Sequence, residues 1–167
     1  MRTESVVEYL LILEHGPTSW GAYCPDIPGC VAVGDTRSEV RDLYEEAIEG
    51  WVEATLEDGD LIPPPAAQTD TVTIALAGQP PRRFLTVLLP TPLGNWSASP
   101  ADVPDLVLEF STRAGALRLL QAALQNHLET LTADGEIVPE PASEASTVSV
   151  RLADLSVRLA DLSAVAA

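Results

Sequence analysis

The chain has 167 residues, 46% of them hydrophobic, and a formal net charge of −16. This hydrophobic content is that of a globular protein and excludes a disordered chain. The 9 basic residues are all arginines and face 25 acidic residues, which argues against nucleic-acid binding because phosphate contacts need clustered Lys and Arg. We expect no direct nucleic-acid binding, and the charge favours a basic partner.

The cellular location is predicted from cysteines and from apolar segments. Cys24 and Cys30 are the only cysteines, too few for a disulfide scaffold, which predicts a reducing cytoplasm. The first residues lack the charged and apolar parts of a signal peptide. No apolar run approaches the roughly 20 residues of a membrane span. We therefore expect a cytoplasmic protein without a membrane partner.

The first half of the chain predicts three strands, one helix and a fourth strand. Runs rich in Val, Leu, Ile and Tyr predict the strands. The helix begins with a capping box, Thr36 and Glu39, continues as an apolar stripe at helical spacing, and ends at Asp58-Gly59. The predicted strands cover residues 6–14, 20–24, 30–33 and 71–76.

The second half repeats the first. At a constant shift of 76 positions, residues 20–74 and 96–150 share 17 identical residues among 55 pairs. A repeat of this length is a small domain rather than a solenoid unit. Gly115 stands where Glu39 completes the capping box, which predicts a weaker start for the second helix. Its predicted elements are strands at 84–89, 96–99, 106–110 and 147–152 and a helix at 113–133.

The repeat predicts an α+β protein of two tandem β-β-β-α-β units. We place the first domain at residues 1–76, a linker at 77–82 and the second domain at 83–152. A unit of this size buries a thin core, so we expect shared packing between the halves or a homo-oligomer. The tail, 153–167, duplicates Val-Arg-Leu-Ala-Asp-Leu-Ser; it is either a short coiled-coil helix or a strand extension with a frayed end.

An acidic helix face is the first candidate binding site. Carboxylates recur every four residues along the first helix, which aligns them on one face. Like charges at that spacing repel, so a basic partner would relieve the repulsion and be steered in; a plain solvated helix surface is the alternative. The candidate partner-binding residues are Asp42, Glu45, Glu46, Glu49, Glu53 and Glu57.

The loop before the third strand is the second candidate. Its two prolines and its glycine fix a turn that places the third strand beside the second, so a structural role is favoured for Pro28 and Gly29. Asp26 is a candidate to cap this loop and has the counterpart Asp102. The loop residues singled out are Tyr23, Pro25, Asp26, Pro28, Gly29 and Cys30.

Metal binding and catalysis find little support in the residue pattern. His15, Cys24 and Cys30 lack the spacing of a metal site, and the two cysteines fit small buried hydrophobic residues better. A nuclease site would need several inward carboxylates for metal ions, and neither a Ser-His-Asp pattern nor a phosphate loop is present. We predict no catalytic residue, no metal and no cofactor.

The first repeat resembles the HicB-like antitoxin domain of bacterial toxin–antitoxin pairs. The resemblance is carried by the string Tyr23-Cys24-Pro25-Asp26-Ile27-Pro28-Gly29-Cys30, by the helix with Glu46-Ala47-Ile48, and by Asp58-Gly59 followed by Ile62-Pro63. It covers residues 6 to 76. The second repeat resembles a diverged copy, because Asp105 and Leu106 replace Gly29 and Cys30.

The resemblance implies a partial RNase H-like fold without nuclease activity. It implies a non-enzymatic protein that binds and neutralises a small basic mRNA-interferase toxin, HicA-like, in the bacterial cytoplasm. Family members usually add a C-terminal DNA-binding module, for which the residues after the second repeat are too few. The alternatives are a stand-alone oligomeric scaffold without a toxin and, less favoured, a residual metal-dependent nuclease.

Overall fold

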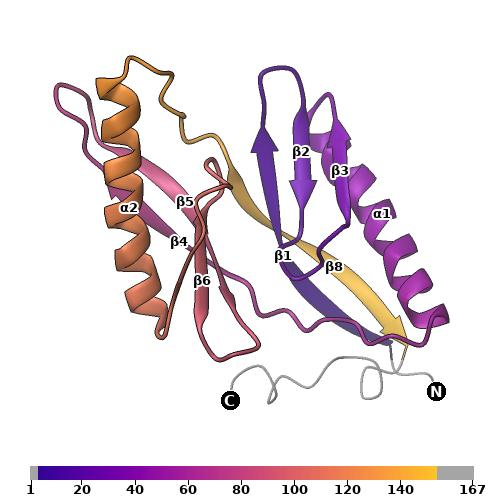
Figure 1. Cartoon of the computed structure of the whole chain (residues 1–167). Coiled ribbons are helices and arrows are strands. Elements are labelled where there is room, and N and C mark those ends of the chain that lie inside the picture. Colours follow the sequence, from indigo (N-terminus) through magenta and orange to yellow (C-terminus); the bar gives the residue numbers. More distant parts are fainter. Residues whose placement is uncertain (1–3, 154–167) are drawn as a thin grey trace. The chain divides into compact units, whose positions relative to one another are not determined.

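The computed structural model describes residues 4–153, which form two helices and eight strands in two compact units (Figure 1). The predicted tail at 153–167 lies outside the described residues except for its first residue. The elements are β1 (Glu4–His15), β2 (Trp20–Tyr23), β3 (Val31–Gly34), α1 (Arg37–Glu57), β4 (Gln68–Ile74), β5 (Arg82–Pro90), β6 (Trp96–Pro100), β7 (Leu108–Phe110), α2 (Arg113–Ala133) and β8 (Glu144–Ala153).

The predicted α+β class and the β-β-β-α-β order of each repeat are confirmed. The helices lie where the sequence places them. Thr36 is the N-cap of α1, and its hydroxyl oxygen accepts a hydrogen bond from the Glu39 N–H at 3.1 Å. The Glu39 carboxylate reaches back to the N–H of Asp35, one residue beyond the Thr36 amide of a standard capping box.

Each sheet contains a strand that comes from the other repeat. The first unit has the antiparallel order β3-β2-β1-β8, and the second has β4-β5-β6-β7. β8 pairs with β1 from Glu4↔Ala153 to Leu13↔Glu144, and Figure 1 shows the two strands side by side. The first unit is thus built from residues up to Ala67 together with β8, and the second from residues 68–143.

The predicted domain boundaries are therefore wrong at the fourth strand of each repeat. Residues 77–82 are not an interdomain linker; residues 77–81 lie in the turn between β4 and β5, and Arg82 begins β5, which pairs with β4. In this turn Gly78 has φ +73°, and the Gln79 N–H donates to the Leu76 carbonyl at 3.1 Å. Antiparallel strands joined by a short connection pair locally, so β4 pairs with β5 and the β1 edge is left for β8.

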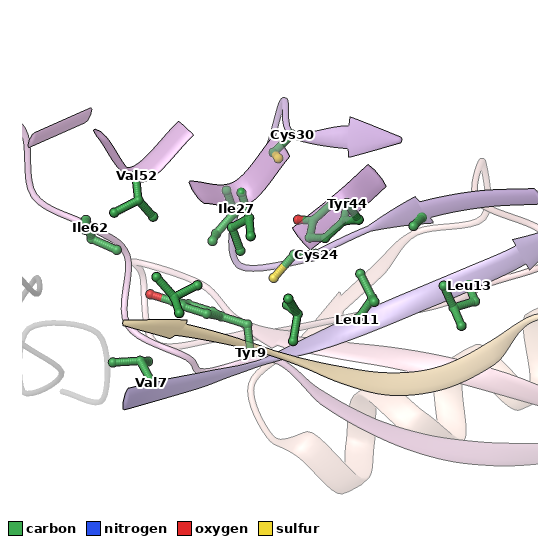
Figure 2. Packing of buried hydrophobic residues seen from close by; sticks show 14 of the residues in the cluster. Val7, Tyr9, Leu11, Leu13, Cys24, Ile27, Cys30, Tyr44, Val52 and Ile62 are labelled. Atoms are coloured by element: carbon green, nitrogen blue, oxygen red, sulfur yellow. The ribbon is translucent and has the colours of Figure 1, made fainter. Parts of the chain in front are cut away.

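The core of the first unit lies between α1 and its sheet (Figure 2). Buried residues at helical spacing on α1 pack against alternate residues of β1, as the 3.6-residue and two-residue periods require. β8 contributes Val148, Val150 and Leu152 to the same core, so the second repeat completes the hydrophobic core of the first unit. The helix and β1 residues are Val40, Tyr44, Ile48, Val52, Val7, Tyr9, Leu11 and Leu13.

The segment after each helix is held to its sheet by a different donor in each unit. In the first unit the Tyr9 hydroxyl donates to the Pro63 carbonyl at 2.6 Å, and burial raises the pKa of this phenol. The second repeat has Phe84 at the equivalent position, which has no hydroxyl. There Arg82 donates to the Pro139 carbonyl at 3.2 Å instead. The second repeat has therefore changed the residue while keeping the bond to this carbonyl.

The helix starts show a second compensated change. In the first unit Glu39 packs over Gly34, where an added Cβ would lie 3.3 Å from the Glu39 side chain. In the second unit the large and the small residue have changed places: Phe110 replaces Gly34, and Gly115 replaces Glu39. A Cβ added to Gly115 would collide with the Phe110 ring and lie 2.8 Å from the Thr112 hydroxyl oxygen. Gly115 therefore makes room for Phe110, and the lost capping box is the consequence.

This packing predicts the sign of a helix substitution. Alanine is favoured over glycine within a helix by about 1 kcal/mol, yet we expect Gly115→Ala to lower the free energy of unfolding by about 1–2 kcal/mol through overpacking against Phe110. In a Phe110→Ala background the same change should instead raise stability. Urea denaturation of the four proteins of this cycle measures both effects. The same sign in both backgrounds would contradict the packing explanation.

Candidate protein-binding site

All six predicted acidic residues of α1 are exposed, but they do not form one surface. Glu45, Glu49 and Glu53 flank the buried row of the helix on the side of β8; we call these three residues the acidic row. Asp42 and Glu46 lie one helical position further from the sheet, and Glu57 lies in the last turn. The predicted face is thus divided into a row beside a strand edge and residues that point to solvent.

Helix α1 runs along β8 in the same direction. Arg37 pairs with Glu144 at 2.7 Å, and the Arg41 guanidinium donates to the Ser146 hydroxyl at 2.5 Å and the Thr147 carbonyl at 2.8 Å. Further along, Glu49 and Glu53 lie beside Val150 and Arg151. Four helix residues rise about 6 Å, and two strand residues rise about 6.8 Å. The spacing of the acidic row along the helix therefore nearly matches the spacing of every second residue of β8.

A groove of about 170 Å³ lies between the acidic row and β8. It is lined by Glu49, Val52, Glu53, Val150 and Arg151. Glu45 has an ion pair with Arg41 at 3.6 Å, whereas Glu49 and Glu53 have no ion-pair partner among residues 4–153. Two exposed carboxylates thus line a hollow beside the edge strand.

The equivalent edge of the second unit is closed by the helix. Gln121 donates to the Thr73 carbonyl at 3.2 Å. Gln125 donates to the Ala75 carbonyl at 2.7 Å and accepts from the Ala75 N–H at 3.3 Å. In the repeat alignment Gln121 and Gln125 stand at the positions of Glu45 and Glu49. The same two positions therefore hold glutamines that bind the edge strand in one unit and carboxylates in the other.

The outer edge of β8 stays open along the acidic row. Antiparallel strands turn the backbone groups of alternate residues outward, and the bond from Arg41 to the Thr147 carbonyl identifies Ser149 and Arg151 as the next outward residues. A carboxylate cannot donate to a carbonyl, so Glu45 and Glu49 cannot replace the glutamines. Among the described residues, nothing forms a hydrogen bond to the outward groups of Ser149 or Arg151.

This edge is the feature that the sequence analysis missed. The prediction assigned the fourth strand of the second repeat to the second domain, so it did not place this strand beside the acidic face of the first helix. A signal was present in the aligned repeats, where Glu45 and Glu49 face Gln121 and Gln125. Its meaning depends on the position of β8, which the repeat alone does not give.

The loop between β2 and β3, the second candidate, is a structural clamp, and we call it the signature loop. Asp26 is 7% exposed, and its Oδ1 accepts from the N–H groups of Ala66 and Ala67 at 3.0 and 2.9 Å. Asp26 thus caps the segment before β4 and not its own loop. Burial raises the pKa of its carboxyl group, while the two amide hydrogen bonds oppose that shift. Asp102 accepts in the same way from Ala142 and Ser143, so both repeats use this aspartate to fix the chain before the exchanged strand.

The other loop residues serve the turn and the core. Tyr23 ends β2 opposite Ile12 and Val31, and Pro25 follows it, half-buried. Pro28 and Gly29 are exposed at the bend, where φ of +88° at Gly29 is a conformation that glycine adopts without strain. Cys30 is buried. The exposed part of the loop is therefore the bend at Pro28 and Gly29.

The two cysteines lie beside the Tyr44 hydroxyl in the core, as Figure 2 shows. Burial raises the pKa of the Cys24 thiol to about 11 and also raises the pKa of Cys30. A buried thiol of raised pKa is a weak nucleophile and a poor metal ligand. The prediction that both cysteines are small buried core residues is confirmed.

The remaining polar candidates are not gathered into a site. The His15 ring stacks on Trp20 with a centroid distance of 4.3 Å. Within residues 4–153, no group of three or more His, Cys, Asp or Glu side chains could hold a metal ion. No helix in that part of the chain is long and apolar enough to cross a membrane.

The first unit therefore combines a helix over an antiparallel sheet with exposed carboxylates beside an open strand edge. Residues 9–75 match the family model of the HicB-like antitoxin of bacterial toxin–antitoxin systems. The first repeat is thus similar to the HicB-like antitoxin family, as the resemblance predicts. The matched segment includes β4, so the structure divides one family sequence between two units.

A curated relative supports the same family. The chain is 27% identical over 131 residues to the protein named Antitoxin HicB 2 of Photorhabdus laumondii subsp. laumondii. The alignment covers 74% of this chain and 94% of the relative, so it extends beyond the first repeat. No solved structure matches the chain significantly.

The open edge predicts an alternating pattern of amide hydrogen exchange in β8. We expect the amides of Ser149 and Arg151 to exchange rapidly and those of Val148 and Val150, which face β1, to exchange slowly. Directly after β4, the Ala75 amide should exchange more slowly than the Ser149 and Arg151 amides because the Gln125 side chain accepts its hydrogen bond. Residue-resolved NMR of the intact protein measures these rates. Slow exchange at both Ser149 and Arg151 would show that the edge is already occupied.

The clamp role of Asp26 predicts a contrast between two substitutions. Asp26→Ala leaves two amides without their acceptor and should lower the free energy of unfolding by about 2 kcal/mol. Asp26→Asn keeps an oxygen that can accept from both amides, so its cost should be less than half as large. Thermal and urea denaturation compare the two variants. Equal losses would indicate that the charge of Asp26, rather than its hydrogen bonds, stabilises the fold.

Proposed function

We propose that this chain is a non-enzymatic antitoxin that binds and neutralises a small basic mRNA-interferase toxin. The observation that carries the proposal is the exposed acidic row on a unit similar to the HicB-like antitoxin family. The name of the Photorhabdus relative agrees with this function. The toxin expected is HicA-like, and its activity would be blocked by occupation of its RNA-binding surface or active residue.

The charge of the chain supports a basic partner. Residues 1–76 hold 15 acidic residues and 3 arginines, which gives −12 of the total formal charge of −16. A field of this sign accelerates the encounter with a cationic protein and weakens as salt rises. The acidic row also carries like charges four residues apart, which a basic partner would neutralise. The helix would thus gain stability when the toxin binds.

The direct test is co-expression with the small basic protein encoded beside the gene. We expect a stoichiometric complex that high salt dissociates and a rescue of cell growth from the toxin. Glu49→Arg with Glu53→Arg should weaken binding at least about tenfold, or roughly 1.4 kcal/mol, without lowering the melting temperature. Glu109→Arg with Glu136→Arg gives the same change in net charge on the second unit and should bind nearly as the parent protein does.

Two outcomes would contradict the proposal. Normal binding by the Glu49→Arg, Glu53→Arg variant would exclude the acidic row as the contact surface. Recovery of the chain alone, at a defined oligomeric mass and with no basic partner, would favour the stand-alone scaffold.

A further inference from the structure

The surface considered for docking is the outer edge of β8 beside the acidic row. We propose that this edge accepts an extended strand from a basic protein partner, with lysine or arginine at alternate positions of that strand facing Glu45, Glu49 and Glu53. The inference rests on the proposed function, because it names the surface through which the partner binds. It goes further in assigning main-chain pairing to Ser149 and Arg151.

The backbone geometry supports addition of a strand. Ser149 and Arg151 turn their N–H and C=O groups outward, and no described residue binds them. An unpaired edge is a template for another strand, and main-chain hydrogen bonds then supply much of the affinity. The second unit shows the closed state of the same edge, in which Gln121 and Gln125 bind Thr73 and Ala75.

The spacing of the carboxylates identifies the side chains of the added strand. Successive members of the acidic row are about 6 Å apart along the helix axis, and residues on one face of a strand are about 6.8 Å apart. A strand added beside β8 would therefore bring every second side chain opposite one glutamate. Cross-strand and cross-groove pairs of opposite charge are favourable, whereas acidic side chains there would be repelled.

The groove lies where such side chains would enter. Its volume is about 170 Å³, and it is bounded by Glu49, Glu53 and the β8 residues Val150 and Arg151. Val52 is 5% exposed and forms the apolar side. The stem of a lysine or arginine can pack on such an apolar wall while its charged end meets the carboxylates. The groove thus fits a long cationic side chain.

The opposite edge of the sheet, β3, has no such complement. Val31 and Val33 are 66% and 65% exposed there, and no acidic residue lies within the strand from Val31 to Gly34. The chemistry of a partner strand at β3 is therefore undefined. Binding at β3 is instead an outcome that the test must detect.

The experiment closes the edge of the first unit with the residues of the second. Glu45→Gln with Glu49→Gln should let the new amides bind the outward groups of β8, as Gln121 and Gln125 bind β4. The matched control, Asp42→Asn with Glu46→Gln, removes two charges from the same helix away from the edge. The probes are the basic protein captured with the chain and a seven-residue peptide alternating lysine and valine. A peptide alternating glutamate and valine is the negative probe.

We expect the lysine peptide and the basic protein to protect the Ser149 and Arg151 amides of the parent chain from hydrogen exchange. The edge-closing variant should lose at least about tenfold in affinity for both probes, and the control variant no more than about threefold. Equal losses in the two variants would overturn strand addition in favour of a charge effect alone. Protection at β3 instead of β8 would also overturn it.

The two proposals fail in different ways. If the basic protein binds while Ser149 and Arg151 stay unprotected, the antitoxin function stands and the docking surface is wrong. If the lysine peptide protects these amides while the chain captures no basic protein, the docking surface stands and the antitoxin function is wrong.

Discussion

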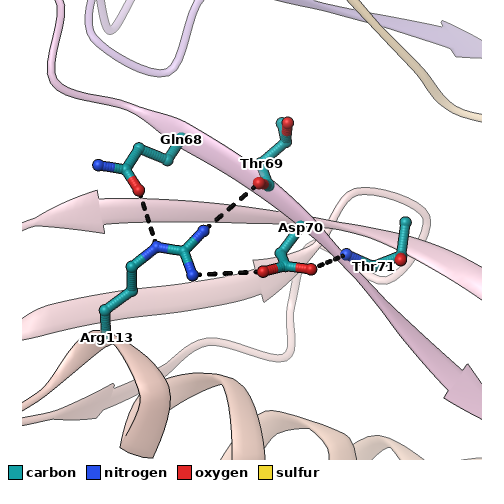
Figure 3. Close-up of polar contacts among 5 residues, drawn as sticks. All are labelled: Gln68, Thr69, Asp70, Thr71 and Arg113. Carbon is teal, nitrogen blue, oxygen red and sulfur yellow. Dashed lines mark hydrogen bonds and ion pairs between the residues drawn. The ribbon is translucent and has the colours of Figure 1, made fainter.

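The exchange of the fourth strands is the constraint on which the rest of the structure depends. Four residues shared by the repeats bracket the two exchange points. Asp26 holds Ala66 and Ala67 in the first unit, and Arg113 then holds Gln68, Thr69 and Asp70 in the second (Figure 3). Asp102 and Arg37 do the same around Glu144. Each exchanged strand is thus fixed on both sides of its departure, and each sheet takes its fourth strand from the other repeat.

The sequence predicted the elements well because their signals are local. The capping box at Thr36 and the Asp-Gly stop at Asp58 set the ends of α1, and the repeat places α2 at the equivalent residues. The exchange was not predictable from the repeat, because β4 and β8 share Thr71/Thr147 and Val72/Val148 and present the same pattern to either sheet. The hairpin around Gly78 decides between the two pairings, and its Gly-Gln-Pro-Pro sequence is equally typical of a linker.

The candidate site could be predicted only in part for the same reason. A four-residue period aligns Glu45, Glu49 and Glu53 in any helix, but only the position of β8 gives that row a neighbour. The signature loop shows the opposite case, in which a conspicuous sequence string contains a buried structural residue. Asp26 is part of the string that carries the family resemblance, yet it is buried and binds the backbone of its own unit. The string that carries the family resemblance therefore includes a buried residue that fixes the chain just before β4.

The strand exchange gives a structural reason for several residues that differ between the two repeats. Its changes preserve its own packing, since Gly115 accommodates Phe110 and Arg82 replaces the bond that Tyr9 makes. Its glutamines close the β4 edge, which the first repeat supplies, while its own strand β8 is left open beside the acidic row. One chain thus holds a closed copy and an open copy of the same edge. On the proposed function, the second repeat supplies the strand on which the first repeat binds its partner, and the two repeats together form a single binding unit.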